Sequence, residues 1–387
     1  MVVLLTVFSY EWKTSILGDV VNVSKGEHPM QLFLSNKPSA FIETIVIGLL
    51  GSLLFHLLHA PLPWMLGPLT GVTIWHFSTG RTLYWPTPLR NIALLLIGYM
   101  LGSSFTQRTV HEITQHFPYI IAVTLSTVFG SLLLGLIIVK KTNIKLIDGL
   151  FGSVPGGLSQ VAILSEETKE IDTGTIVFMQ TIRVILVILL IPFLTMYFIK
   201  PEAPINSPAT EVGKEAVAYP SLFGLLLLTM IGAFLGKKLK LPAAFLTGPL
   251  LIIALFSVTA VEVPALPPFF ILISQYFLGI YLGLYLKKEM SSNIRRIGFY
   301  SIFTSILLVF FSFLLAILLT KITSINLATA FLSTAPGGLA EMGVTATIVD
   351  ADLAMISGYQ LFRIFFIMFI ALPLLQWWIR RKVRLNQ

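Results

Sequence analysis

Long apolar runs alternate with short polar connections over almost the whole chain of 387 residues. A helix of about 20 apolar residues spans the hydrocarbon core of a bilayer, which is about 30 Å thick. The pattern therefore predicts an all-α integral membrane protein. The runs cover about residues 40–58, 63–79, 88–107, 117–139, 146–164 and 172–199, then about 220–236, 243–260, 267–286, 298–319, 326–348 and 353–379.

The second six runs repeat the first six. Pro155-Gly156-Gly157 recurs as Pro336-Gly337-Gly338, 181 positions later. Gly67-Pro68-Leu69 and Gly248-Pro249-Leu250 are separated by the same 181 positions. A constant offset predicts an internal duplication with one pattern of helices in each half.

The duplication divides the chain into four parts. Residues 1–39 form an N-terminal extension without a counterpart, and residues 40–200 form the first membrane repeat. Residues 201–219 form a polar linker, which begins with a proline-rich stretch typical of a semi-rigid spacer. Residues 220–387 form the second repeat with its basic C-terminal tail.

Each Pro-Gly-Gly sequence lies inside the fifth run of its half. Proline removes a backbone donor and glycine loosens the chain, so a helix is expected to break there. A broken backbone at membrane depth is tolerated where it is buried in protein or lines a wet cavity. Two such breaks in matching halves point to a transport site. The alternative is a pair of kinked helices in a packed bundle.

The pairs Gly98 and Gly102, and Gly279 and Gly283, place two small residues four positions apart in the third run of each half. Such pairs are typical of faces where two membrane helices pack closely. We therefore predict that these glycines serve packing.

Basic residues between the runs predict the orientation, because short cytoplasmic loops collect Lys and Arg. In the second half the basic residues follow the first, third and sixth runs. All three basic clusters lie on the same side of the membrane if the fifth run enters and leaves the membrane on one side. In the first half they follow the second and fourth runs. We predict ten crossings, two re-entrant Pro-Gly-Gly segments and two inverted repeats, with both termini cytoplasmic in a bacterial inner membrane. Twelve crossings would make the repeats parallel.

The sixth run of each half contains one arginine about ten residues from its start. These are Arg183 in the first half and Arg363 in the second. A charge at the bilayer centre costs about 2.5–3.5 kcal/mol on insertion scales, so each should face the protein interior. The planar guanidinium suits a carboxylate or phosphate. Gln180 and Gln360 lie one helical turn earlier on the same face. These two Gln-x-x-Arg units could bind one central anion, or each arginine could cap the free carbonyls of its own break.

Glu341 follows the second break, at the place where the first half has Gln160. A single carboxylate beside a broken helix could carry a proton or help to coordinate sodium. It could instead form a fixed ion pair with Arg363 or Arg183. The expected substrate-binding residues are Arg183, Arg363, Gln180, Gln360, Pro155, Gly156, Gly157, Ser159, Gln160, Pro336, Gly337 and Gly338, with Glu341 as the ion-coupling residue.

Composition argues against several other classes. The chain is 56% hydrophobic and contains no cysteine, so it has neither a disulfide framework nor a thiolate nucleophile. The net charge of +8 lies in the connections and the C-terminal tail, which indicates membrane orientation and not nucleic-acid binding. The six histidines form no HExxH motif, and no nucleophile elbow or Walker loop is present. We expect no enzyme activity, no catalytic residue, no bound metal and no cofactor.

The stretch Leu62-Pro63-Trp64-Met65-Leu66-Gly67-Pro68-Leu69, the Pro-Gly-Gly segments and the tandem duplication together resemble the membrane AbrB family. The resemblance covers about residues 40–380, and the family is distinct from the small soluble DNA-binding regulator of the same name. Its members often carry an ammonia-monooxygenase label, for which the residues offer little support.

The resemblance implies an integral inner-membrane transporter or permease. We expect a secondary transporter for a small anionic organic solute, coupled to H⁺ or Na⁺. The alternatives are a channel, a membrane-embedded regulatory or sensor protein, and, with least support, a metal-dependent monooxygenase. The expected partners are the solute, the coupling ion, the lipid bilayer and further copies of the chain.

Overall fold

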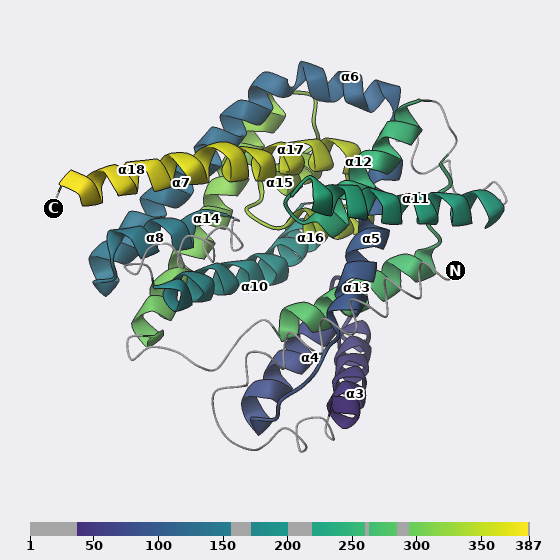
Figure 1. Cartoon of the computed structure of the whole chain (residues 1–387), viewed down its shortest axis with the longest axis horizontal. Coiled ribbons are helices and arrows are strands. Elements are labelled where there is room, and N and C mark those ends of the chain that lie inside the picture. Colours follow the sequence, from purple (N-terminus) through teal and green to yellow (C-terminus); the bar gives the residue numbers. More distant parts are fainter. Residues whose placement is uncertain (1–36, 156–171, 200–218, 260–262, 285–293, 386–387) are drawn as a thin grey trace. The chain divides into compact units, whose positions relative to one another are not determined.

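A computed structural model describes residues 37–155, 172–199, 219–259, 263–284 and 294–385. Every regular element within these ranges is a helix, as the apolar runs predict (Figure 1). The predicted N-terminal extension and linker lie almost entirely outside the described residues. The first Pro-Gly-Gly sequence is described only as far as Pro155.

The helices of the first half follow the predicted runs within a few residues, with one addition and with the fifth run described only as far as Pro155. The short helix α6 is bent by 85° from α5 and was not expected, because its sequence is mostly polar. The elements are α3 (Lys37–Leu57), α4 (Pro63–Thr79), α5 (Thr87–Ser103), α6 (Gln107–Gln115), α7 (Phe117–Thr142), α8 (Leu146–Ser153) and α10 (Thr173–Phe198).

The helices of the second half match their runs equally well. The fifth run is divided into α15 and α16 at Pro336-Gly337-Gly338, so the predicted break is confirmed there. The sixth run contains a short π-helical stretch, η1. The elements are α11 (Tyr219–Lys238), α12 (Ala244–Val258), α13 (Pro268–Gly283), α14 (Ile294–Ile322), α15 (Leu327–Thr334), α16 (Leu339–Ile348), α17 (Leu353–Phe366), η1 (Ile367–Ala371) and α18 (Leu372–Leu385).

Within the described residues, five helical segments are long and apolar enough to cross a membrane, or six if α5 and α6 form one span. The helices α12 and α13 are apolar but have only 15 and 16 residues. The predicted count of ten crossings therefore stays a prediction. The five segments are Pro38–Leu57, Phe117–Thr142, Thr173–Phe198, Arg295–Ile322 and Leu353–Trp378.

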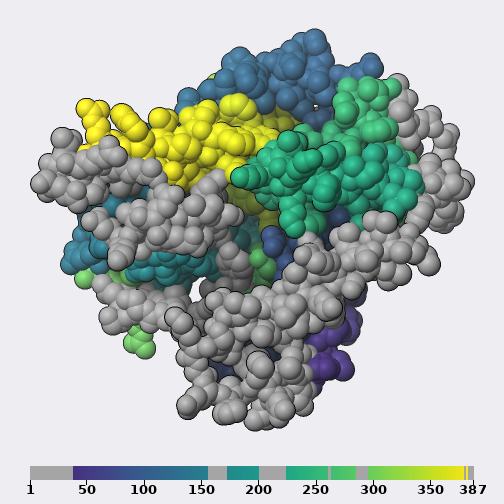
Figure 2. Space-filling view, viewed as in Figure 1, coloured from purple at the N-terminus to yellow at the C-terminus, as the bar shows by residue number. Residues whose placement is uncertain are grey.

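Large apolar side chains cover much of the outer surface, as lipid contact requires. On α14, Phe299, Phe303 and Phe310 are all exposed. On α11, Phe234 is 68% exposed, and Figure 2 shows the side chains of this helix, coloured green, on the surface of the face drawn. In a water-soluble protein, apolar patches of this extent are unusual.

The chain forms two compact units, and each contains helices from both halves of the sequence. Unit 1 comprises residues 1–96 and 267–285, with α3, α4 and α13 as its complete described helices. Unit 2 comprises residues 97–266 and 286–387, and it holds both broken segments and both arginines.

In unit 1, α3 and α4 lie along one another, and α13 packs closely on α4. A Cβ at Gly279 would lie 2.4 Å from the carbonyl oxygen of Met65, and one at Gly283 would lie 2.7 Å from that of Leu69. Neither distance can be accommodated without moving a helix. Both residues therefore have to be glycine for this crossing to form, which confirms the predicted packing face.

The same crossing occurs in unit 2 between α5 and α12. A Cβ at Gly98 would lie 2.6 Å from the carbonyl oxygen of Leu246, and one at Gly102 would lie 2.7 Å from that of Leu250. Each of these residues is 181 positions from its counterpart in unit 1. The third helix of each repeat therefore packs on the second helix of the other repeat.

The turn before the second helix of each repeat also has the same backbone geometry. Leu62 and Ala243 precede α4 and α12 with φ of 48° in both cases. His59 and Lys240, three residues earlier, have φ of 51° and 54°. Left-handed conformations are uncommon for residues other than glycine. Their recurrence at the same offset shows that the duplication extends to the turns.

Candidate functional site

The first break begins where α8 ends at Ser153 and the chain continues through Val154 and Pro155. The last carbonyl groups of a helix have no partner within it. Arg183 on α10 provides one, because its Nη1 donates to the carbonyl oxygens of Ser153 at 2.9 Å and Val154 at 3.1 Å. Gln180, one turn earlier, donates to the carbonyl oxygen of Phe151 at 3.0 Å.

The second break is bonded in the same way by α17. Arg363 donates through Nη1 to the carbonyl oxygen of Ala335 and through Nη2 to that of Gly337 at 2.6 Å. Gln360 donates to the carbonyl oxygens of Leu332 at 2.8 Å and Ala335 at 3.2 Å, and its own side-chain oxygen accepts a bond from Arg363.

Both Gln-x-x-Arg units therefore cap the carbonyl end of a helix, α8 in the first repeat and α15 in the second. This is the structural alternative that the sequence left open, and it does not test whether the same groups also bind a solute. Arg183 and Arg363 are 5% and 4% exposed, and the Nε–H of each is buried without a hydrogen-bond partner.

Glu341 lies in the first turn of α16, directly after the second break, and is 8% exposed. Its carboxylate turns back onto Gly338, where a Cβ would collide with Oε2. A negative charge at the N-terminus of a helix is favoured by the helix dipole. Glu341 thus places a carboxyl group at the second break, and its coupling role stays a prediction.

The other predicted site residues divide between the two breaks. Pro336, Gly337 and Gly338 form the described link between α15 and α16, and Pro155 is buried at the end of α8. The remaining four lie outside the described residues, namely Gly156, Gly157, Ser159 and Gln160.

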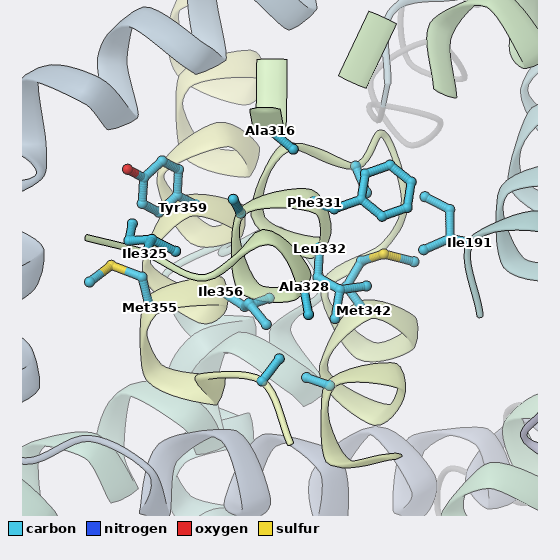
Figure 3. Packing of buried hydrophobic residues seen from close by; sticks show 14 of the residues in the cluster. Ile191, Ala316, Ile325, Ala328, Phe331, Leu332, Met342, Met355, Ile356 and Tyr359 are labelled. Atoms are coloured by element: carbon cyan, nitrogen blue, oxygen red, sulfur yellow. The ribbon is translucent and has the colours of Figure 1, made fainter. Parts of the chain in front are cut away.

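The second break is enclosed by an apolar cluster (Figure 3). Phe331 and Leu332 of α15 and Met342 of α16 are fully buried there. Next to these side chains, two hydrogen bonds link α14 to α15. Ser312 Oγ donates to the carbonyl oxygen of Thr334 at 2.5 Å, and Thr334 Oγ1 donates to that of Ser312 at 2.9 Å.

A small cavity of about 20 Å³ lies beside the first break, which is room for one or two water molecules. Arg183 lines this cavity together with Ser301, Thr304 and Ser305 of α14, which the sequence analysis did not select. For Ser301 and Thr304 the duplication contained a signal. Positions 181 residues before Ser301 and Thr304 hold the apolar residues Ile120 and Val123.

Among the described residues, no group of three or more His, Cys, Asp or Glu side chains is arranged to hold a metal ion.

These features define a multi-pass helical membrane protein with a broken helix in its second repeat and a matching interruption in its first, each capped by a buried Gln-x-x-Arg unit. The sequence profile described as "Transition state regulatory protein AbrB" matches residues 64–379. The chain belongs to this AbrB family, as the resemblance predicted.

Two relatives match over most of their length. The "Putative regulator AbrB" of Escherichia coli (strain K12) is 27% identical over 333 residues, which are 84% of this chain and 92% of that protein. The "Uncharacterized protein YhjN" of Bacillus subtilis (strain 168) is 27% identical over 291 residues, 72% of this chain and 76% of that protein. Both agree with the membrane family and not with the small soluble regulator.

Proposed function

We propose that the chain is a secondary transporter for a small anionic organic solute. The observation that carries this proposal is the pair of buried arginines, Arg183 and Arg363, each at an interrupted helix and at equivalent positions of two repeats. Interrupted helices in matching halves are the recurring site architecture of secondary transporters.

The membrane arrangement in this proposal has two inverted repeats of five crossings each. The two Pro-Gly-Gly segments enter and leave the membrane on one side, and both termini lie in the cytoplasm of a bacterial cell. The distribution of Lys and Arg between the apolar runs supports this topology. The exchange of helices between the repeats, α5 onto α12 and α13 onto α4, agrees with a symmetric pair.

Electrostatics favour an anion as the solute. The bonds described for Arg183 go to backbone carbonyls, and those of Arg363 go to carbonyls and Gln360. Carbonyl dipoles offset only part of a buried positive charge. A carboxylate or other oxyanion placed near Arg183 and Arg363 would compensate this charge.

Glu341 is our candidate for coupling. It carries an acidic group at the second break only, and a proton or sodium ion bound there would change the charge next to Gly338 and the start of α16. Movement of one helix bundle against the other would then give alternating access.

A regulatory role is the second candidate, because the printed names of the family and of the Escherichia coli relative describe a regulator. A membrane-embedded regulator or sensor would bind the solute without moving it. A channel would conduct the solute without saturation. A metal-dependent monooxygenase is the alternative with the least support.

The test is a flux assay on the full chain reconstituted in liposomes. Vesicles loaded with an unlabelled small carboxylate are mixed with the same labelled compound, with and without gradients of Na⁺ and H⁺. We expect saturable exchange that falls sharply in Arg183→Gln, provided that the variant elutes as folded protein. Folded wild type that exchanges no carboxylate or phosphate, or that gives sustained single-channel currents, would overturn the proposal.

A further inference from the structure

The last helix of the chain changes along its length from apolar through aromatic to basic. α18 continues a candidate span that ends at Trp378, and Leu374, Trp377 and Trp378 are all exposed on it. Tryptophan near the end of a membrane helix marks the level of the lipid headgroups. Residues 353–387 contain no acidic residue. Four of the six residues that follow Trp378 are basic, namely Arg380, Arg381, Lys382 and Arg384.

The chain stays helical beyond the level of the tryptophans. α18 ends at Leu385, and the part after Trp378 adds about 10 Å at 1.5 Å per residue. The headgroup layer on one side of a bilayer is about 5–8 Å thick. The four basic positions therefore fall within the headgroup layer or just outside it.

The first repeat provides an internal comparison. Tyr197 and Phe198 lie 180 positions before Trp377 and Trp378, and both are exposed. An exposed aromatic pair thus ends the apolar part of the sixth run in both repeats. In the first repeat the helix stops there, because α10 ends at Phe198.

The basic helical extension belongs to the second repeat alone. The positions equivalent to Arg381, Lys382 and Arg384 hold Pro201, Glu202 and Pro204. The shared fold of the repeats therefore does not require the extension, and its charge serves something found only at this end of the chain.

The helix α7 runs beside this segment and in the same direction. Phe117, at the start of α7, packs edge to face on Phe362 of α17, with ring centroids 5.5 Å apart. About ten residues further along each helix, Val128 of α7 and Leu372 of α18 belong to one apolar cluster. The two helices therefore end on the same side of unit 2.

The end of α7 adds two positive charges on that side. Lys140 and Lys141 lie in its last turn, and both are exposed. Within the ranges that the structure describes, Lys140, Lys141 and Arg381 take part in no ion pair. A group of exposed cations at one level of the membrane attracts anionic partners.

The position of Arg381 suits a phosphate group as the partner. Its guanidinium lies 5.6 Å from the ring centroid of Trp377, where it is attracted by the face of the indole. A guanidinium held over a ring still presents N–H groups at its edge, and their planar geometry matches the oxygens of a phosphate. At headgroup level, the phosphate groups belong to phospholipids.

We propose that the ends of α18 and α7 bind the headgroups of anionic phospholipids in the cytoplasmic leaflet. Arg381 and its three basic neighbours on α18 supply most of the charge, and Lys140 and Lys141 supply the rest. The tryptophans hold the helix at the depth where these charges meet the phosphates. The inference takes the cytoplasmic side of the C-terminus from the proposed function, and it holds for any solute.

The experiment is native mass spectrometry of the full chain in detergent, with phosphatidylglycerol and phosphatidylcholine of the same acyl chains added in equal amounts. Each Lys or Arg near an anionic surface favours binding by a factor of about five. We therefore expect wild type to bind at least about tenfold more phosphatidylglycerol than phosphatidylcholine. The ratio should fall to about twofold in a variant with four changes, Arg380→Gln, Arg381→Gln, Lys382→Gln and Arg384→Gln.

Two control variants separate this effect from folding and from charge elsewhere. The first carries Arg380→Lys, Arg381→Lys and Arg384→Lys, which keep the charge and should keep the preference. The second carries Arg81→Gln and Arg108→Gln, because these exposed arginines form ion pairs with Glu43 and Glu112. It should bind lipid like wild type, and size-exclusion chromatography shows that each variant is folded.

The outcomes separate this inference from the transport function. Equal binding of the two lipids by wild type overturns it, and so does a preference that survives in the glutamine variant or is lost in the lysine variant. Loss of the preference when inorganic phosphate is added shows a site for free phosphate and also overturns it. A protein that keeps the expected preferences but exchanges no anion in liposomes supports the lipid site and overturns transport.

Discussion

Ser312 and Thr334 exchange hydrogen bonds across two helices, each hydroxyl donating to the backbone carbonyl of the other residue. Thr334→Val keeps the shape of the side chain and removes one of these donors. We expect a loss of about 0.6–1.7 kcal/mol in the free energy of unfolding, the range measured for hydrogen bonds between helices of a membrane protein. Chemical denaturation in detergent measures it.

The control for this pair is Ser153→Ala, because Ser153 holds the place equivalent to Thr334 and its hydroxyl donates to the carbonyl oxygen of Gly149 in its own helix. It should cost less stability than Thr334→Val. Equal losses in both variants would contradict the interlocking of α14 and α15.

Gln360 makes more bonds than its counterpart, and removing it should cost more. Gln360→Leu takes a partner from the carbonyls of Leu332 and Ala335 and from Arg363, whereas Gln180→Leu frees only the carbonyl of Phe151. We expect losses of about 2–4 kcal/mol and about 1 kcal/mol, because a buried group left without a partner carries its full desolvation penalty. Thermal unfolding of the two variants side by side tests the order.

Gly98→Ala should destabilise the contact between α5 and α12. The new methyl group would lie 2.6 Å from the carbonyl oxygen of Leu246, and overpacking of this kind costs about 1–3 kcal/mol. Gly224→Ala on α11 is the control, since nothing lies within 4 Å of its Cβ position. There alanine should stabilise the helix by about 0.5–1 kcal/mol. A Gly98→Ala protein as stable as wild type would show that α5 and α12 can move apart far enough to accommodate the methyl group without loss of stability.

Asp148 predicts a pH dependence of stability. It lies at the start of α8, outside the five candidate spans, and is buried. Burial raises the pKa of this carboxyl, and the charge of Asp172 adds to the rise, while the hydrogen bond from the Asp172 amide and the charge of Lys145 oppose it. The folded chain therefore holds this proton more tightly than the unfolded chain does.

A raised pKa gives stability that is complete below about pH 4 and is lost as the pH increases through the folded value. Asp148→Asn keeps an acceptor for the amide of Asp172 and cannot ionise. The variant should be more stable than wild type at pH 7, with a difference that shrinks toward pH 4. Unfolding measured at both pH values decides this, with the surface variant Asp350→Asn as control. A variant less stable at pH 7 would contradict the sign.

Most helices were predictable because apolar runs mark them and because the duplication supplied a second copy of each run. Helix α6 was not predicted, because its segment is mostly polar and gives no apolar run, although Thr106 is its N-cap. The left-handed backbone conformations of Leu62 and Ala243 were not predicted either, since neither residue type favours that conformation.

The arginines were predictable and the cavity was not. A charged residue in an apolar run is conspicuous, so Arg183 and Arg363 could be selected, and capping of the breaks could be anticipated as one of two roles. Ser301 is a small polar residue in a long helix, where hydroxyls usually bond to their own backbone. In the sequence, Ser301 differs from its neighbours only by comparison with Ile120, the residue at the equivalent position of the first repeat. That its hydroxyl is buried without a hydrogen-bond partner is seen only in the structure.

The crossing of α5 with α12 and of α13 with α4 has a consequence for the origin of the chain. Each glycine face finds its partner in the other repeat, so a protein made of one repeat would carry two complementary surfaces and no way to cover them within itself. Such a half-length ancestor could bury both only against a second copy. Fusion of two genes would then have turned an obligate pair into a single polypeptide, and freed the two copies of the break to diverge.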